Sequence, residues 1–124
     1  MILGAGIDIL DMRRIERLVV KFGSQFERRI FTDAELQFCR RREKFIESLA
    51  KMFSIKEAVI KAISEVNGIR WHDIEIFHND LGKPVIELSG QALLRTLAKS
   101  VRFKIEASTS DEPPYVAAFV ILWA

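Results

Sequence analysis

Three charged residues stand where they could form a reactive site. Glu57 and Lys61 lie four residues apart within Leu49–Ile63, a stretch whose apolar residues recur at helical spacing. An acid and a base therefore lie one turn apart on the polar side of a helix whose other side is held in the core. The lone carboxylate of Asp8, in the apolar N-terminal segment, is available as their partner. The alternative is a solvated pair that stabilises the helix by roughly 0.2–0.5 kcal/mol.

Two further features favour a site over a plain surface. Lys56 projects from the middle of the apolar side of the helix, where an ammonium group is costly unless a carboxylate or a phosphate lies within reach. In the N-terminal segment, alternation places Gly4, Gly6 and Asp8 on one face of a strand. Glycines below a carboxylate leave room for a helix or a ligand to approach closely.

The elements that position these residues follow from periodicity and turn signals. Met1–Leu10 is expected to be a buried strand, and the central helix is expected from about Glu47 to about Asn67. One strand and three helices, followed by two strands, a helix and two strands, indicate a single α+β domain over residues 1–124, with an antiparallel sheet wrapped on the long central helix. The remaining expected elements are helices at Met12–Phe22, Thr32–Arg42 and Ser89–Ala98, a short segment at Gln25–Ile30, strands at Asp73–Phe77, Val85–Leu88, Val101–Ser108 and Tyr115–Leu122, and a turn at Thr109–Pro114 between the last two strands.

Composition limits the class of protein. The chain has 124 residues, 49% of them hydrophobic, which suffices for one domain with a modest core. Its 19 basic and 17 acidic residues give a net charge of +2, which is too balanced for a protein that binds nucleic acid alone. The single cysteine, Cys39, excludes an internal disulfide and is expected in the core, and two histidines exclude a zinc cluster. Without an apolar run of membrane-spanning length, the chain is expected in the cytoplasm.

Two separated motifs resemble those of a known family. The first runs from Gly6 to Ile9 and continues with Arg14 and Ile15. The second, Ser-Leu-Ala-Lys-Met-Phe-Ser-Ile-Lys-Glu-Ala, ends at Ala58 and is followed by Lys61 one turn later. On these motifs the chain resembles the holo-acyl-carrier-protein synthases, a family of 4′-phosphopantetheinyl transferases, and the resemblance extends over nearly all of its length. The 4′-phosphopantetheinyl transferase fold is therefore expected.

The resemblance implies an enzyme that transfers the 4′-phosphopantetheine group of coenzyme A to a serine of acyl carrier protein, in fatty acid biosynthesis. Adenosine 3′,5′-bisphosphate is the other product. Asp8 and Glu57 match the family's metal-binding acids, and Mg²⁺ suits a site with two carboxylates, phosphate oxygens and water. Lys61 would offset charge on the leaving bisphosphate. The serine would lose its proton to Glu57 or to a metal-bound water.

The resemblance also implies binding residues and an assembly. Arg14 matches the family's carrier-docking arginine, and Arg17 lies on the same helix face. The family often has arginine at the position of Met52 and histidine at the position of Asp111, so contacts to the 3′-phosphate are expected from other residues. A homotrimer with the site between subunits is typical of the family. The residues expected to bind coenzyme A are Lys44, Lys51, Lys56, Lys61, Gly82, Lys83 and Pro84.

A different class of protein remains as an alternative, namely a non-catalytic basic module that binds nucleic acid or an acidic protein. Between Asp11 and Lys44, ten basic residues stand against six acidic ones. Such a module would not explain the glycine-flanked Asp8, Glu57 or the inward Lys56. The nine phenylalanines also lie mostly at apolar positions rather than among the basic residues, where they could stack on bases. We therefore expect neither nucleic acid nor a membrane as a partner.

Overall fold

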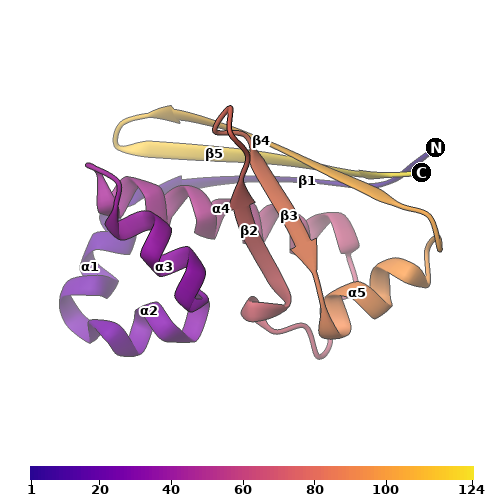
Figure 1. Cartoon of the computed structure of the whole chain (residues 1–124), viewed down its shortest axis with the longest axis horizontal. Helices are drawn as coiled ribbons and strands as arrows, with labels where there is room; N and C mark the ends of the chain where they lie inside the picture. Colours follow the sequence, from indigo (N-terminus) through magenta and orange to yellow (C-terminus); the bar gives the residue numbers. More distant parts are fainter.

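The computed structural model describes residues 1–124 and is organised around a 19-residue helix, α4 (Phe45–Ile63) (Figure 1). Eleven residues of α4 are buried, so most of the surface of the helix is covered along its middle. Other elements cover it from several directions. The predicted central helix is confirmed.

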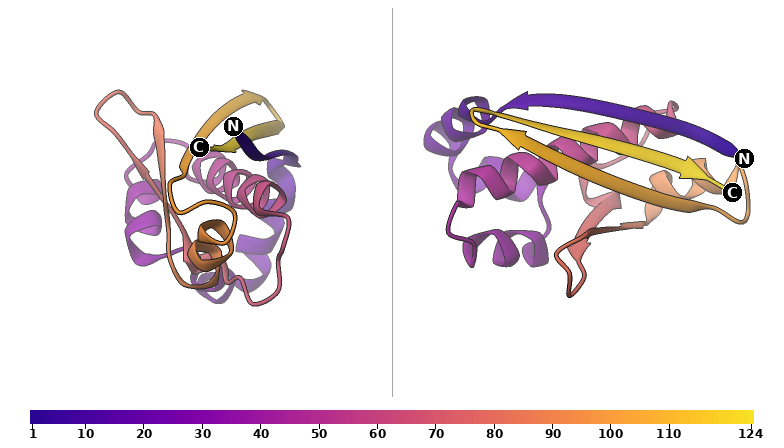
Figure 2. Two further views of the ribbon diagram at one scale, coloured as in Figure 1. Left: turned by 90° about the vertical axis from the view of Figure 1, so that its right-hand side faces the viewer. Right: turned by 90° about the horizontal axis from the view of Figure 1, so that it is seen from above.

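A three-stranded antiparallel sheet lies along one side of α4, in the order β1 (Ile2–Asp11), β5 (Tyr115–Trp123) and β4 (Lys104–Glu112) (Figure 2). A separate hairpin of β2 (Ile74–His78) and β3 (Pro84–Leu88) crosses another side. The short 3-10 helix η1 (Trp71–Asp73) precedes β2, and α5 (Gly90–Leu97) follows β3. The predicted α+β class with an antiparallel sheet wrapped on the central helix is confirmed, with two sheets rather than one.

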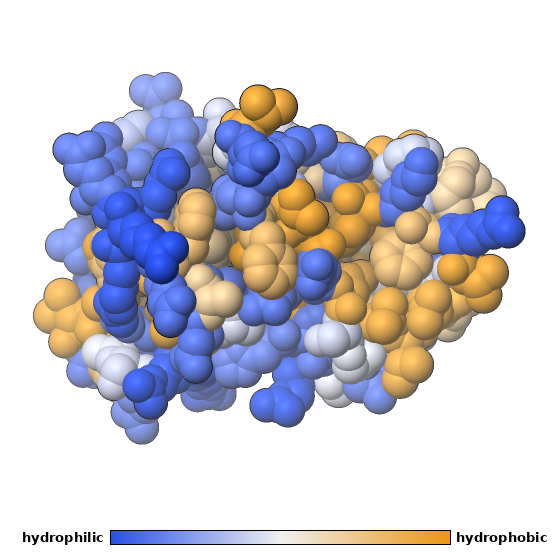
Figure 3. Space-filling view, viewed as in Figure 1, coloured by the Kyte–Doolittle hydropathy of each residue, from blue (hydrophilic) through white to orange (hydrophobic).

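Three short helices, α1 (Met12–Phe22), α2 (Ser24–Ile30) and α3 (Asp33–Arg40), pack beside one end of α4 (Figure 1). Two of the three predicted helix caps form: the Asp11 carboxylate accepts from the backbone N–H of Arg13, and Thr32 and Glu35 make a capping box. The third, Ser89 before α5, makes no hydrogen bond with its side chain. Hydrophilic side chains gather over this end of the molecule (Figure 3). None of the helices combines the length and the apolar character that crossing a bilayer requires.

The glycines of β1 let the strand lie directly on α4. A Cβ atom added to Gly6 would stand 1.8 Å from the carbonyl oxygen of Ala58, and one added to Gly4 would stand 2.0 Å from that of Ala62. Only residues without a side chain permit this approach. The room left by the glycines is thus filled by a helix, which brings Asp8 against α4.

Several predicted boundaries are wrong, and the strand predicted from Val101 begins only at Lys104. The central helix ends at Ile63 rather than near Asn67, because Ser64 leaves the helical region with a φ of 74°. The turn predicted at Thr109–Pro114 is shorter, because β4 continues as far as Glu112 and stays paired with β5 throughout. Long-range pairing has extended a strand through residues with weak strand propensity.

The prediction that Met1–Leu10 is a buried strand is correct for one face only. The other face, which has no layer over it, exposes Ile7 (67%) and Ile9 (72%). Phe119 and Tyr115 of β5 lie across from β1 and are also exposed. Ile7, Ile9, Tyr115 and Phe119, here called the outer sheet face, form an apolar surface of a kind that monomeric proteins rarely leave open.

Candidate active site

Asp8 and α4 meet at the point where the glycines of β1 have brought strand and helix together. The Asp8 carboxylate, 14% exposed, accepts a hydrogen bond from Ser54 Oγ at 2.8 Å and lies 3.4 Å from Lys61 Nζ. Lys61 also donates to the carbonyl oxygen of Ile7 at 2.8 Å. Helix and strand therefore hold one carboxylate between a hydroxyl and an ammonium group. Sequence reasoning assigns no role to Ser54, although its spacing of three residues from Glu57 places it on the same side of the helix.

Glu57 stands close enough to Asp8 for the two carboxylates to repel each other. Burial and the charge of Asp8 raise the pKa of Glu57, and the charges of Lys61 and Arg14 oppose the shift. The predicted grouping of Asp8, Glu57 and Lys61, here called the acid cluster, is thus present in the fold.

The donor set of the acid cluster fits a hard divalent cation. Such an ion makes two neighbouring carboxylates favourable as anions. The structure contains no group of three or more histidine, cysteine or acidic side chains that could together hold a metal ion. Mg²⁺ commonly takes one or two carboxylates and completes its shell with water and substrate phosphates, so Asp8 and Glu57 would suffice for it.

Glu57 lines a cavity of about 890 Å³, here called the Arg14 cavity, together with Arg14, Ile30, Phe53 and Trp71. The Arg14 guanidinium lies over the ring of Phe53, 5.8 Å from its centroid. The cavity thus combines cationic and aromatic groups beside a carboxylate. Arg17, predicted together with Arg14, lies instead on a separate shallow groove with Arg13 and Glu16.

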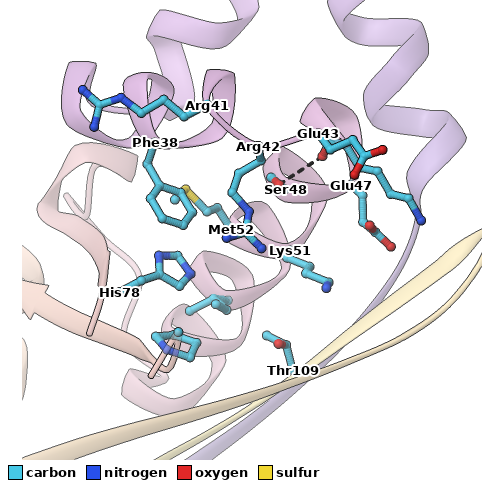
Figure 4. Close-up of a pocket in the computed structure, with 14 residues that line it drawn as sticks. Phe38, Arg41, Arg42, Glu43, Glu47, Ser48, Lys51, Met52, His78 and Thr109 are labelled. Atoms are coloured by element: carbon cyan, nitrogen blue, oxygen red, sulfur yellow. Dashed lines mark hydrogen bonds between the residues drawn. The ribbon is translucent and has the colours of Figure 1, made fainter. Parts of the chain in front are cut away.

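A second cavity, of about 480 Å³, opens between the C-terminal end of α3, the first half of α4 and the β2–β3 turn (Figure 4). Arg42 and Lys51 point into the space between the Phe38 and His78 rings and Thr109 (Figure 4). Four cationic side chains against two acidic ones give the cavity a positive balance of charge, which would attract an anion. The residues that define this basic cavity are Phe38, Arg41, Arg42, Glu43, Lys44, Glu47, Ser48, Lys51, Met52, Ile55, His78, Gly82, Pro84 and Thr109.

The basic cavity contains several predicted residues and others that sequence reasoning misses. Lys44, Lys51, Gly82 and Pro84 all line it, in agreement with their predicted grouping. Two missed residues, Phe38 and His78, stack with ring centroids 4.1 Å apart and an interplanar angle of 3°. Arg42 is missed because a basic residue at a helix C-terminus has an ordinary explanation in the helix dipole. The only signal for His78 is its place directly after the predicted strand Asp73–Phe77.

Two of the lysines predicted to bind coenzyme A are already paired with carboxylates. Lys51 Nζ lies 3.2 Å from Asp111 Oδ1, and this hydrogen bond and the charge of Lys51 hold the pKa of Asp111 below its usual value. Lys83 forms an ion pair with Glu106 of β4 at 2.5 Å and does not line the basic cavity. Asp111, at the position where the family often has histidine, therefore pairs with one of the four cationic side chains of the basic cavity.

The prediction that Lys56 binds coenzyme A is wrong. Its side chain is completely enclosed, and its ammonium group is 2.9 Å from Glu35 Oε1. The carboxylate that the sequence requires near Lys56 is thus a side chain of α3 and not a ligand. Cys39 is fully buried, as predicted, and burial raises its pKa to about 12, so the thiol remains protonated at neutral pH.

Comparisons with known proteins identify the family of the chain. The family model of the 4′-phosphopantetheinyl transferase superfamily matches residues 4–120. The holo-[acyl-carrier-protein] synthase of Vibrio cholerae is 42% identical over 125 residues, which cover 98% of each chain.

Two solved structures extend the likeness to the fold. The Neisseria meningitidis holo-[acyl-carrier-protein] synthase has a TM-score of 0.86 at 40% identity, with all of both chains covered. The Helicobacter pylori synthase, solved in complex with coenzyme A, has a TM-score of 0.81 at 27% identity and covers 95% of this chain and 98% of its own. The chain therefore belongs to the holo-[acyl-carrier-protein] synthase family of the 4′-phosphopantetheinyl transferase superfamily.

Proposed function

We propose that this chain transfers the 4′-phosphopantetheine group of coenzyme A to a serine hydroxyl of apo-acyl carrier protein, in fatty acid biosynthesis. The observation that carries the proposal is the position of the acid cluster, which forms where Asp8 of β1 meets α4. Residues of the same helix also line the basic cavity and the Arg14 cavity. Phosphoryl transfer depends on positioning and on charge neutralisation more than on covalent catalysis. A site with two acids and a lysine, flanked by cationic cavities, suits those requirements.

The nucleotide part of coenzyme A is assigned to the basic cavity. Arg42, Lys44 and Lys51 supply positive charge there, and Gly82 and Pro84 form one edge. Guanidinium and ammonium groups bind phosphate oxygens by charge-assisted hydrogen bonds. Lys83 is a weaker member of the proposed set, because its ammonium group is engaged by Glu106.

The reaction joins serine Oγ to the phosphorus that carries pantetheine and breaks the bond from that phosphorus to adenosine 3′,5′-bisphosphate. A Mg²⁺ ion held by Asp8 and Glu57 would supply Lewis-acid stabilisation of the pyrophosphate. Lys61 stands beside Asp8 and would offset charge on the leaving group. The serine proton leaves toward Glu57, a carboxylate that also lines the Arg14 cavity.

The carrier protein is assigned to the Arg14 cavity. Arg14 and Glu57 line the same cavity, so a carrier that pairs acidic groups with Arg14 would present its serine near Glu57. Arg17 lies outside this cavity and would act through long-range attraction. A non-catalytic basic module explains less, because Arg13 and Arg40 of the basic segments are paired with Asp11 and Glu27.

The proposal includes a homotrimer that works in the cytoplasm. The outer sheet face exposes Ile7, Ile9, Tyr115 and Phe119, and a symmetric contact between copies would cover it. A free cysteine fits a reducing compartment. Light scattering at micromolar concentration should give about three times the chain mass of 14.3 kDa. A fully active monomer would remove the trimer from the proposal.

The transfer itself is tested by incubating the protein with coenzyme A, Mg²⁺ and an apo-carrier protein and weighing the carrier by mass spectrometry. Asp8→Asn and Glu57→Gln should each abolish most turnover and leave the melting temperature in metal-free buffer equal or higher, because the repulsion between the acids is relieved. They should also lose the stabilisation that Mg²⁺ with coenzyme A gives the parent protein.

The control is Glu65→Gln, which changes an exposed acid beyond the end of α4 that pairs only with Arg95. This variant should behave like the parent protein. An unmodified carrier would overturn the proposed function. Near-parent turnover of Asp8→Asn, or its outright unfolding, would show that Asp8 is structural and that the two-acid metal site is mistaken.

A further inference from the structure

Lys56 and Glu35 form an ion pair that is closed to solvent, since both side chains are 0% exposed and the two charged groups are 2.9 Å apart. The other two hydrogen-bond acceptors of the ammonium group are the carbonyl oxygens of Ile74 at 2.6 Å and Trp71 at 3.1 Å. An ammonium group has three donors, so every one is used. A single side chain of α4 thus ties together α3, η1 and the start of β2.

Glu35, the partner of Lys56, holds two further segments through its own hydrogen bonds. Its Oε1 accepts from the backbone N–H of Thr32 at 2.8 Å, and its Oε2 accepts from the backbone N–H of Ile76 at 2.9 Å. The turn between α2 and α3 is therefore fixed to the same charge pair as β2. His72 of η1 adds a further contact to that turn, at 3.2 Å from the carbonyl oxygen of Phe31.

Stability alone does not explain why a charge pair occupies this position. Apolar residues of similar volume in place of a buried ion pair often leave a protein equally stable or more stable, because the desolvation of both charges offsets their attraction. What an ion pair supplies in addition is direction, since each hydrogen bond requires its partner at a defined place. The role of Lys56 should therefore be sought in the segments that its hydrogen bonds hold in place.

Two of the segments that Lys56 and Glu35 hold border the Arg14 cavity. Ile30, at the end of α2 beside the α2–α3 turn, and Trp71 of η1 both line it, together with Arg14 and Glu57. The Trp71 ring stacks on Phe53 with centroids 5.3 Å apart, and Phe53 in turn lies beneath the Arg14 guanidinium. The hydrogen bond from Lys56 to the Trp71 backbone thus fixes the residue on which this aromatic stack rests.

We propose that Lys56 is a positioning residue, which holds Trp71 and the α2–α3 turn so that the Arg14 cavity admits the carrier protein with its serine at Glu57. Lys56 itself touches no substrate. This inference rests on the proposed function, and in particular on the assignment of the carrier to that cavity. Loss of the Lys56 contact should weaken use of the carrier and leave use of coenzyme A, which is assigned to the other cavity, unchanged.

The first test is the paired substitution Lys56→Met with Glu35→Gln, which removes both buried charges at once. Lys56→Met alone would leave an unpaired buried carboxylate and should lower the melting temperature, whereas the paired variant should recover most of the loss. In the paired variant, KM for the apo-carrier should rise at least about fivefold, because the cavity wall is no longer fixed. KM for coenzyme A should not change.

A second readout does not depend on activity. With Trp123→Phe in the background, Trp71 is the sole tryptophan, and quenching of its fluorescence by acrylamide should be stronger in the paired variant than in the parent. Lys99→Met, at an exposed lysine after α5, is the matched control and should leave both KM values and the quenching unchanged. A parent protein without transferase activity would refute the proposed function, and the quenching would still test the positioning.

Trp71→Ala keeps the inference testable should the paired variant fail to fold, because this substitution removes the wall without exposing a charge. It should reproduce the rise in KM for the carrier at constant KM for coenzyme A. The inference is overturned by an unchanged carrier KM in Trp71→Ala or in the folded paired variant. It is also overturned by a parallel rise of both KM values, which would indicate general loosening of the fold.

Discussion

Replacing Gly6 with alanine should separate the two acids of the active site. The new Cβ would stand 1.8 Å from the carbonyl oxygen of Ala58, whereas real Cβ contacts are essentially never shorter than 3.0 Å. Strand and helix must therefore move apart by at least 1.2 Å, the difference between the two distances. Neither side of the contact is a flexible side chain that could turn away. Since Ala58 follows Glu57 and Gly6 precedes Asp8 by two residues, the displacement falls on the acids themselves.

The size of the effect follows from this displacement. A misplacement of about 1 Å at a reacting centre can cost on the order of 10²-fold in rate, so kcat of Gly6→Ala should fall by about that factor. Overpacking should also lower the free energy of unfolding by about 1–3 kcal/mol. Carrier mass spectrometry measures the first quantity and urea denaturation the second.

Ile63→Val separates geometry from stability, because it removes a buried methyl group from α4 without pressing on β1. It should lower the free energy of unfolding by about 0.5–1.5 kcal/mol and leave turnover near that of the parent. The reasoning fails if Gly6→Ala turns over as fast as Ile63→Val when both are assayed well below their melting temperatures.

Further predictions concern charge. Arg14→Glu should raise KM for the carrier on the order of tenfold, weaken the salt dependence of the reaction and spare KM for coenzyme A; an unchanged carrier KM would contradict the docking role. Asp111→Asn should lower KM for coenzyme A by at most about fivefold, because a phosphate no longer competes with that carboxylate for Lys51, and a higher KM would contradict this. Because burial and Asp8 raise the pKa of Glu57, the stability it contributes is full below its ordinary pKa of 4.5 and is lost as pH rises through the higher folded value. Urea unfolding without metal should therefore show the parent gaining on Glu57→Gln as pH falls, and a pH-independent difference would exclude the shift.

Much of the secondary structure of this protein could be predicted from the local sequence pattern. The helical period of Leu49–Ile63, the cap at Asp11 and the capping box at Thr32 all form as expected, because each depends on residues a few positions apart. The pairing of Asp8 with α4 could also be anticipated, because only glycines at alternate positions of a strand admit a helix so closely.

The tertiary structure alone decided which partner each charge takes. Sequence indicates that Lys56 needs an anion, but local pattern cannot tell whether a side chain or a substrate phosphate supplies it, and Glu35 reaches it only after α3 has packed on α4. The same holds for Lys83, which lies in the β2–β3 turn and pairs with Glu106 of β4, a strand of the other sheet. The exposure of Ile7 depends likewise on whether another layer covers the sheet. Hydrogen-bonding capacity and periodicity are properties of a short segment, whereas partner choice and burial depend on which distant segments arrive beside it.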